Sequence, residues 1–385
     1  MEEKRGNIIL GIILAILMII AIAIVIMNPN KTQKTADTTQ NIQGESDIGK
    51  QQNRNVEQIN NEEEKEISMH VGGTFCKIEN QVVFYEDVNK SIYLYNVNDN
   101  KTSKIATLES SVNKMYFDGE NIYYIPSYYR GKGIYKIDLQ GTITKISENS
   151  SLQLWITEDK IYFVKQIGYD EINGNPQGTL CVMDKDGNNI VEVAKSVKNY
   201  FYLQNDKIYY TTQDRKMHVI NKDGTNQEEL VQGRKFVIHT AGKYILYIDY
   251  ANQEAKHILN LETKEDSIIG YFGTSKNYQG KTYLNARKKL DDGSLETDYT
   301  LFQIQEDGTI KEIGKFVDFE IDLKYIINEK AYLSNQKEGT YIINLDNGQK
   351  ESAEDYNSCR YFLGGYGYKI DDSNLEDIKI ERIEL

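Results

Sequence analysis

Short runs in which aromatic and β-branched residues alternate with polar ones recur along most of the chain. Residues 205–230 show the pattern clearly: the runs "IYYT" (208–211) and "MHVI" (217–220) are separated by a polar stretch, and Lys222-Asp223-Gly224 follows. Alternation with a period of two is typical of half-buried strands, and a nearby glycine marks a tight turn. This stretch therefore predicts an antiparallel hairpin.

The hairpin pattern occurs eight times between residues 81 and 383. The first strands of the eight pairs are 81–87, 121–126, 160–165, 207–212, 244–249, 281–286, 330–335 and 366–371. The second strands are 91–97, 133–139, 179–185, 216–222, 256–261, 300–306, 339–345 and 377–383. When the first strands are aligned, they lie 40, 39, 47, 37, 37, 49 and 35 residues apart, about 41 on average.

Each hairpin is flanked by two more predicted strands. A turn such as Asp186-Gly187 leads from the second strand into a run such as "TITKIS" (142–147), and a run such as "LQLWI" (152–156) precedes the first strand. Four antiparallel strands that recur at about 40 residues are typical of a β-propeller blade. A parallel solenoid is the alternative, but its repeats are shorter and contain no chain of hairpins. The predicted fold class is therefore all-β, an eight-bladed β-propeller over residues 66–385.

The two ends of this region suggest how the ring closes. The eighth repeat has a predicted strand before its hairpin, "CRYFL" (359–363), and the hairpin itself. No predicted fourth strand follows the hairpin before Leu385. An extra run, "KEISMHV" (65–71), stands before the first strand of the first repeat. We expect this N-terminal strand to complete the eighth blade. Seven blades remain the alternative, because the glycine-rich eighth repeat matches the pattern least well.

The pattern I-Y-Y … I-Y-x-I-D-x-x-G, as in "NIYYIPSYYRGKGIYKIDLQG" and "KIYYTTQDRKMHVINKDG", resembles an extracytoplasmic bacterial β-propeller family of unknown function. That family is related to the YWTD-type propellers of lipoprotein receptors. The resemblance covers residues 66–385 and implies a propeller fold and a binding role. It brings no catalytic residues to this chain. The fifth repeat, which lacks the glycine turn, and the eighth repeat depart from the pattern.

Residues 8–27, "IILGIILAILMIIAIAIVIM", form an apolar run of 20 residues without a charge. At about 1.5 Å per residue a helix of this length spans about 30 Å, the hydrocarbon thickness of a bilayer. Lys4 and Arg5 precede it, which places residues 1–7 in the cytoplasm and the rest of the chain outside. We expect an uncleaved signal anchor, with a cleaved signal peptide as the alternative. Residues 28–65 are polar and lack aromatic residues, so we expect a disordered linker.

The charge of the chain excludes some classes of partner. The formal net charge is −13, and residues 66–385 alone carry 38 Lys and Arg against 49 Asp and Glu. An acidic body disfavours nucleic acid and an anionic membrane surface, so the expected membrane contact is residues 8–27 alone. Cys76, Cys181 and Cys359 lie far apart with no CxxC pair, and we expect three free thiols, with a Cys76–Cys359 disulfide at the ring closure as the alternative.

Metal and catalytic motifs find little support in the sequence. The stretch "DKDGNN" (184–189) has the spaced carboxylates of a calcium loop, but a strand is predicted where a calcium loop needs a helix with a later acid, and a hairpin turn explains the pattern better. The four histidines, His70, His218, His239 and His257, show no zinc spacing. No G-x-S-x-G elbow is present. We therefore expect no metal, no cofactor and no assigned catalytic residue.

Tyrosines at equivalent strand positions are expected in the packing between blades. These are Tyr93, Tyr123, Tyr135, Tyr162, Tyr209, Tyr283 and Tyr332. Three enlarged loops, 127–133, 166–178 and 287–298, interrupt the repeat and are expected on one face, where scaffolds commonly carry function. Their exposed aromatic and charged residues are the candidate ligand-binding residues, which are Tyr128, Tyr129, Arg130, Tyr169, Asp170, Arg287 and Asp291. Length variation without function is the alternative interpretation of these loops.

Two functional classes fit these observations. The favoured one is a membrane-anchored, extracytoplasmic binding or scaffold module for a protein, peptide or glycan. The alternative is an extracytoplasmic lyase or hydrolase with its site at the mouth of the propeller channel. Convergence of carboxylates, Arg and His at that mouth would favour the enzyme, and an aromatic surface would favour binding.

Overall fold

A computed structural model gives the fold of the chain. It describes residues 64–127, 132–149, 151–169, 176–214, 216–231, 235–241, 243–249, 251–278, 281–305, 307–316, 322–335, 339–375 and 377–385. The apolar run 8–27 and the polar segment 28–63 lie outside the described residues, so the predicted anchor and most of the linker stay predictions. Within the described ranges, none of the helices has the length and apolar character needed to cross a bilayer.

The described residues form six antiparallel sheets, which follow one another along the chain. The first sheet consists of β1 (Phe75–Ile78), β2 (Gln81–Glu86), β3 (Ser91–Asn96) and β4 (Lys101–Thr107). The second consists of β5 (Val112–Phe117), β6 (Asn121–Pro126), β7 (Ile134–Asp138) and β8 (Ile143–Ser147). The third has seven strands, β9 (Leu154–Ile156), β10 (Lys160–Tyr169), β11 (Pro176–Asp184), β12 (Val191–Gln204), β13 (Lys207–Thr212), β14 (Met217–Asn221) and β15 (Glu228–Val231).

The remaining sheets complete the order of the chain. The fourth has eight strands, β16 (Lys235–Ala241), β17 (Tyr244–Asp249), β18 (Ala255–Asn260), β19 (Asp266–Tyr271), β20 (Ser275–Tyr278), β21 (Lys281–Lys289), β22 (Leu295–Ile304) and β23 (Ile310–Phe316). The fifth consists of β24 (Asp322–Ile327), β25 (Lys330–Asn335), β26 (Gly339–Asn344) and β27 (Lys350–Ser352). The last has three strands, β28 (Tyr361–Leu363), β29 (Tyr366–Asp371) and β30 (Lys379–Glu384), and the short helix η2 (Glu354–Tyr356) precedes it.

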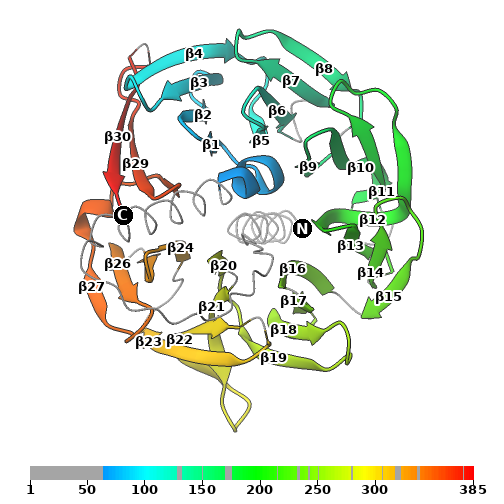
Figure 1. The fold of residues 1–385 in the computed structure, drawn as a ribbon, viewed down its shortest axis with the longest axis vertical. Coiled ribbons are helices and arrows are strands. Elements are labelled where there is room, and N and C mark those ends of the chain that lie inside the picture. Colours follow the sequence, from blue (N-terminus) through cyan, green and yellow to red (C-terminus); the bar gives the residue numbers. More distant parts are fainter. Residues whose placement is uncertain are drawn as a thin grey trace, which may run out of the picture.

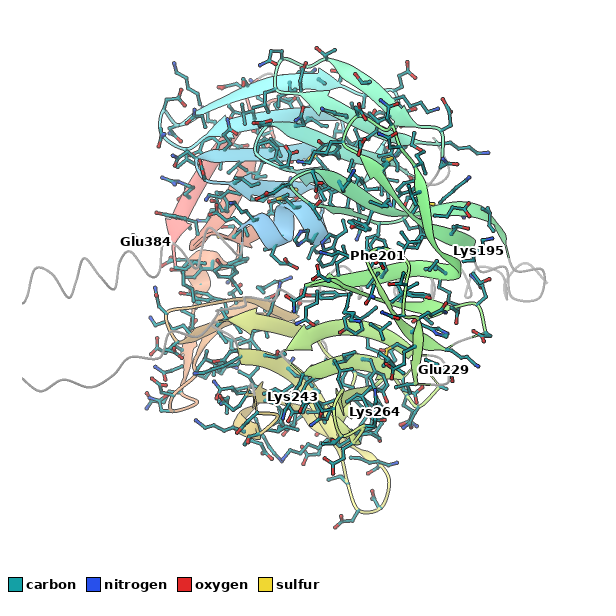
Figure 2. The ribbon with its side chains drawn as sticks, turned by 45° about the vertical axis from the view of Figure 1, so that its right-hand side comes forward. Lys195, Phe201, Glu229, Lys243, Lys264 and Glu384 are labelled. Atoms are coloured by element: carbon teal, nitrogen blue, oxygen red, sulfur yellow. The ribbon has the colours of Figure 1, made fainter. Side chains whose placement is uncertain are left out.

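The sheets surround a common axis in chain order, so that β1–β4 lie beside β28–β30, and the fold is a β-propeller (Figure 1). All eight predicted hairpins are present as antiparallel pairs. The two largest sheets arise where neighbouring four-strand units share hydrogen bonds. The 14-residue strand β12 runs without a break from Lys195 inward to Phe201, and it joins two such units (Figure 2).

The core lies between neighbouring four-strand units, whose inner strands pack against one another both between sheets and within the two largest sheets. Cys76, Val83 and Ile92 of the first sheet, for example, pack with Met115 and Ile122 of the second. The tyrosines at the repeated strand position behave as predicted, and the buried ones are Tyr93, Tyr123, Tyr162, Tyr209, Tyr283 and Tyr332. Tyr135, the seventh, is half-buried and stacks on Tyr124. Cys76, Cys181 and Cys359 are free thiols.

The N-terminal segment departs from the prediction. Residues 65–71 were expected to form a strand on the last blade, but the chain is helical from Glu64 and ends in the π-helix η1 (Ile67–Val71). This helix lies inside the ring against β1, β5 and β9 (Figure 1). Apolar alternation in "ISMHV" indicates a strand. In the structure Ile67 and Met69 instead pack, from inside the ring, against the apolar clusters between neighbouring sheets. Gly72, at φ 65°, then turns the chain towards β1, where any side chain would collide with the ring of Tyr116.

The ring is closed by side chains instead of by an added strand. An apolar cluster that includes Phe75, Phe84 and Tyr93 of the first sheet and Tyr368 and Ile380 of the last fills the seam between them. The prediction that residues 65–71 complete the last blade as a strand was therefore wrong, although the first and last sheets are neighbours as expected.

Polar contacts and ring contacts reinforce this seam. The Tyr93 hydroxyl donates to the Leu375 carbonyl at 3.1 Å, and Thr74 Oγ1 lies 3.0 Å from the Tyr361 hydroxyl. The Arg360 guanidinium lies 3.5 Å from Glu86. The rings of Phe75 and Tyr361 stack with centroids 4.4 Å apart. Among the described residues, the seam is thus a packed interface in which no strands of the two sheets pair.

Candidate functional site

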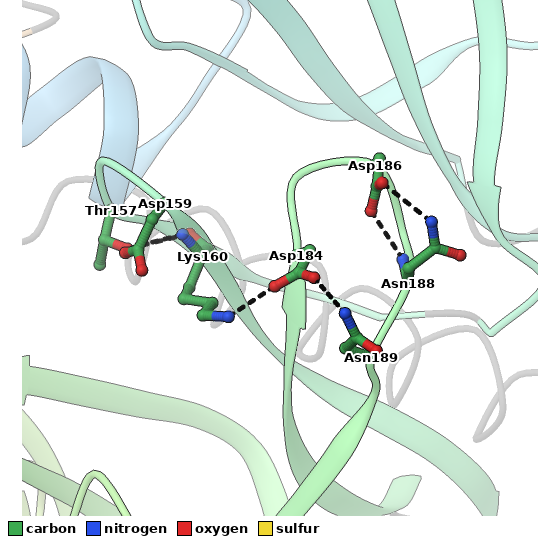
Figure 3. A network of polar contacts seen from close by, with 7 residues as sticks. All are labelled: Thr157, Asp159, Lys160, Asp184, Asp186, Asn188 and Asn189. Atoms are coloured by element: carbon green, nitrogen blue, oxygen red, sulfur yellow. Dashed lines mark hydrogen bonds and ion pairs between the residues drawn. The ribbon is translucent and has the colours of Figure 1, made fainter.

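The calcium-like stretch is a hairpin turn whose carboxylates are already engaged (Figure 3). Asp184 accepts from Lys160 Nζ at 2.5 Å and from Asn189 Nδ2 at 2.6 Å, and Asp186 accepts from the main chain and side chain of Asn188 at 3.0 and 2.8 Å. The Lys160 ammonium lowers the pKa of Asp184, and the Asn188 N–H lowers that of Asp186. Within the described ranges, no group of three acidic, His or Cys side chains is placed to hold a metal. The turn interpretation accounts for these residues.

The turn that follows Asp186 requires glycine at residue 187. Gly187 has φ 87°, and a Cβ there would run into the carbonyl oxygen of Ile146 on the neighbouring sheet. The turn thus brings two sheets into main-chain contact, and only a residue without a side chain permits this.

The predicted loop residues are only partly described. Tyr128, Tyr129, Arg130 and Asp170 lie outside the described residues. Tyr169 ends β10, where its backbone pairs with Pro176, but its side chain is not among those described. Whether these residues gather on one face with the third loop therefore stays a prediction.

Arg287 and Asp291 lie on the same long hairpin, β21–β22. The Arg287 guanidinium donates to the Thr297 carbonyl at 3.0 Å and lies over the ring of Tyr299, with its carbon 5.1 Å from the ring centroid. Asp291 is exposed in the turn of this hairpin. Arg287 therefore stiffens its own hairpin, whereas the Asp291 carboxylate faces solvent.

A different surface stands out in the structure: the outer edge of the last sheet. In the described part of the chain, β30 pairs with β29 along all six of its residues and has no strand on its other side. The main-chain groups along such an edge have no ladder partner. A fourth strand of the last sheet would lie along this edge. We predicted from the sequence that residues 65–71 form that strand.

A groove runs along this edge, between β30 and β4 of the first sheet. It consists of two adjoining hollows, of about 720 Å³ at the Lys379 end and about 590 Å³ at the Glu384 end, and both are lined by Asn100 and Ile380. Glu384 lies at the tip of the β30 arrow on the margin of the molecule (Figure 2). At about 3.4 Å per residue, the six residues of β30 give the edge a length of about 20 Å. We call this feature the rim groove.

The rim groove combines an apolar wall with charged margins. Tyr93, Leu375, Ile378 and Ile380 form its apolar part, and Tyr93, Ile378 and Ile380 belong to the cluster that closes the ring. The end near Lys379 is further lined by Lys101 and Lys104 of β4 and by Asp377. The other end is lined by Glu381, Arg382 and Glu384.

A second cluster of ionisable and aromatic side chains lies inside the ring, around η1. His70 Nδ1 lies 2.5 Å from Glu66 Oε2, and the His70 ring stacks on Trp155 of β9. Glu64, which is buried, pairs with Lys77 of β1, and desolvation raises the pKa of the Glu64 carboxyl although Lys77 opposes this shift. Lys114 of β5 donates to the Val71 carbonyl at 3.2 Å. These groups hold η1 in place.

One feature of the sequence pointed to the rim groove: the missing fourth strand of the eighth repeat, which we expected residues 65–71 to supply. The pattern predicted no fourth strand in the eighth repeat, and Lys379 stood in a predicted strand. Nothing in the pattern showed that β4 and β30 face each other across a groove, because they are more than 270 residues apart.

Comparisons with known proteins concern the fold alone. No family model matches the chain, and no curated protein matches it in sequence. Among solved structures, the computationally designed Ika8 protein is similar over 81% of this chain and 98% of its own, with a TM-score of 0.55 and 10% identity. An oligogalacturonate lyase from Vibrio parahaemolyticus covers 81% of this chain and 86% of its own, with a TM-score of 0.43 and 12% identity. A chain of the nidogen/laminin complex covers 49% of this chain and 74% of its own, with a TM-score of 0.34 and 13% identity.

Proposed function

We propose that this chain is a membrane-anchored, eight-bladed propeller that acts as a binding module and takes up an extended polypeptide along the rim groove. The observation that carries the proposal is the open edge of β30 beside a groove with an apolar wall. An exposed edge strand offers alternating N–H and C=O groups to a further strand, and pockets beside it select side chains. In seven of the eight repeats a described strand follows the hairpin at this position; these are β4, β8, β12, β15, β19, β23 and β27. Among the described strands, none occupies this position in the eighth repeat, and we propose it as the place of a partner.

The sequence outside the described residues supports the location. Residues 8–27 have the length and composition of a membrane-spanning helix, and Lys4 and Arg5 favour a cytoplasmic N-terminus. The propeller then stands in the extracytoplasmic space on the polar segment 28–63. Protease added to intact cells is expected to degrade the propeller, and protection of the propeller would contradict this orientation.

The enlarged loops form a second proposed contact surface for the same binding role. Tyr128, Tyr129, Arg130, Tyr169, Asp170, Arg287 and Asp291 remain the residues proposed there. The support is that Tyr and Arg are favoured at binding hot spots and that these loops interrupt a regular repeat.

A lyase or hydrolase role is the alternative. Its catalytic groups would be expected in the cluster of ionisable and aromatic side chains around η1, inside the ring. There Glu66 and His70 lie together, but His70 also stacks on Trp155, and Lys77 is paired with Glu64. These contacts anchor η1 within the ring. The described geometry of the channel therefore supports a structural role for the cluster, and the binding module is the better-supported function.

The test compares two tryptophan substitutions on equivalent outer strands. Thr102 of β4 lines the rim groove, whereas Thr144 of β8 occupies the exposed outer strand of the next sheet. The full chain, tagged and extracted in detergent from its own envelope, should retain a partner in the wild type and in Thr144→Trp. Thr102→Trp fills the groove and should lose that partner. Retention of the same partner by Thr102→Trp would show that the groove is not the binding site.

A further inference from the structure

The strand that fills the rim groove has a preferred direction. Every strand pair in the described sheets is antiparallel. In seven repeats the strand beyond the hairpin pairs antiparallel with the second strand of that hairpin, and β30 is the corresponding strand of the eighth repeat. Antiparallel pairing is also slightly more stable per residue than parallel pairing. An added strand should therefore run against β30, with its N-terminal end near Glu384 and its C-terminal end near Lys379.

The charges along the groove change sign between its two ends. Near Lys379 the lining carries three lysines, Lys101, Lys104 and Lys379, against one acid, Asp377. Near Glu384 it carries two acids, Glu381 and Glu384, against Arg382. An incoming strand thus meets positive charge at one end and negative charge at the other.

Several of these charges have no strong partner within the described part of the chain. Lys101 and Lys104 are exposed on β4 and take part in no ion pair there. Lys379 lies 3.7 Å from Asp377, and both side chains are largely exposed. Arg382 lies over the Tyr366 ring, with its guanidinium carbon 4.6 Å from the ring centroid. The lysine end therefore has a surplus of positive charge available to a ligand.

We infer that the partner segment is an extended strand with basic residues in its N-terminal half, acidic residues in its C-terminal half, and apolar residues at alternate positions. The acidic half then lies against Lys101, Lys104 and Lys379, and the basic half lies against Glu381 and Glu384. The apolar side chains meet the wall formed by Tyr93, Ile378 and Ile380. This inference rests on the proposed function and adds the direction and charge order of the ligand.

The position of Glu64 indicates that the segment comes from another protein. Glu64 lies beside Gly364, and Gly365 accepts a hydrogen bond from Leu385, so the described chain begins near the Glu384 end of β30. A strand formed by the residues just before Glu64 would finish at that end and would therefore run parallel to β30. The sequence before it, with Arg54 followed by Glu57, Glu62 and Glu63, would also place its acids at the acidic end. Both direction and charge thus disfavour the chain's own segment.

Two peptides of identical composition test the inference on the full chain in detergent micelles. Fluorescein-labelled KVKVTVEVE has the expected charge order, and EVEVTVKVK has the reverse. Fluorescence anisotropy at low salt should show at least about tenfold tighter binding of KVKVTVEVE. The double variant Lys101→Glu/Lys104→Glu should abolish or invert this preference. Lys311→Glu, on the exposed outer strand β23, is the matched control and should leave it unchanged.

The outcomes separate the inference from the proposed function. If both peptides bind equally well, and Thr102→Trp binds neither, the groove remains a strand-binding site but the inferred charge order is wrong. Binding of neither peptide would overturn both. If deletion of residues 52–63 creates binding that the intact chain lacks, the occupant is the chain's own segment and the inference is wrong.

Discussion

The imidazole of His70 stacks on the indole of Trp155, with ring centroids 4.2 Å apart and an angle of 12° between the planes. His70 belongs to η1 and Trp155 to β9, so this contact ties the start of the described chain to the third sheet. Tyr202 of β12 meets the same indole edge-on at a centroid distance of 4.9 Å. The contact makes η1 part of the folded ring, although it is not part of any sheet.

A double-mutant cycle measures this contact. Trp155→Ala should lower the free energy of unfolding by about 3–5 kcal/mol, because it removes a buried aromatic side chain. His70→Ala should cost about 1 kcal/mol, and the coupling between the two should be about 0.5–1.5 kcal/mol. Urea unfolding followed by circular dichroism is the measurement, since Trp155 is the only tryptophan. A coupling energy of zero within error would show that the stacking contributes nothing.

The buried pair formed by Glu64 and Lys77 should respond strongly to the loss of one partner. Lys77→Met leaves a buried carboxylate without its cation and is expected to cost about 3–5 kcal/mol of unfolding free energy. Lys264→Met is the matched control, because Lys264 forms an exposed pair with Glu228 at 2.9 Å. Exposed pairs contribute about 0–1 kcal/mol. Equal melting temperatures for the two variants would contradict the structural role of the Glu64–Lys77 pair.

Burial of Lys256 should contribute a rise of stability with pH above neutrality. Its side chain is 3% exposed, and burial lowers the pKa of its ammonium from 10.5 to about 8. Between these two values the unfolded chain holds a proton that the folded chain has released, so stability increases with pH in this window. Lys114, whose pKa burial also lowers to about 8, contributes in the same range.

Replacing Lys256 by Met should therefore remove its contribution to the pH dependence and stabilise the protein at pH 7, by on the order of 3 kcal/mol. Urea unfolding at pH 7, 8, 9 and 10 measures both effects. Lys243→Met, at a more exposed site paired with Glu262, should leave the pH profile unchanged. If the difference in unfolding free energy between the wild type and Lys256→Met stays constant from pH 7 to pH 10, Lys256 is not desolvated.

The enlarged loops can be tested once a partner is known. Replacing Tyr128, Tyr129, Arg130 and Tyr169 by Ala should weaken binding at least about tenfold if they include hot-spot residues. The melting temperature should change little, because the substitutions lie in or next to the enlarged loops predicted from the sequence and outside the repeated strand positions. Undiminished binding by the fourfold variant would leave the rim groove as the sole contact surface.

The repeated local pattern determined the strands and turns of this protein. Alternation in "KIYYTT" and the turn at Asp186-Gly187 are local properties, because strand faces follow from a period of two and a positive φ follows from glycine. All eight hairpins and the burial of Tyr123, Tyr209 and Tyr283 could be predicted on this basis. The adjacency of the first and last sheets also followed, because a ring of repeats must bring its ends together.

The tertiary structure alone decided where the N-terminal segment lies and what surrounds the last strand. "ISMHV" has the alternation of a strand, but contacts with three sheets inside the ring favour a helix, and no local pattern encodes those contacts. The rim groove depends on β4 and β30, which are distant in sequence and meet only when the ring closes. Its charge order is therefore a property of the assembled ring, since the lysines of two separate segments become neighbours only there.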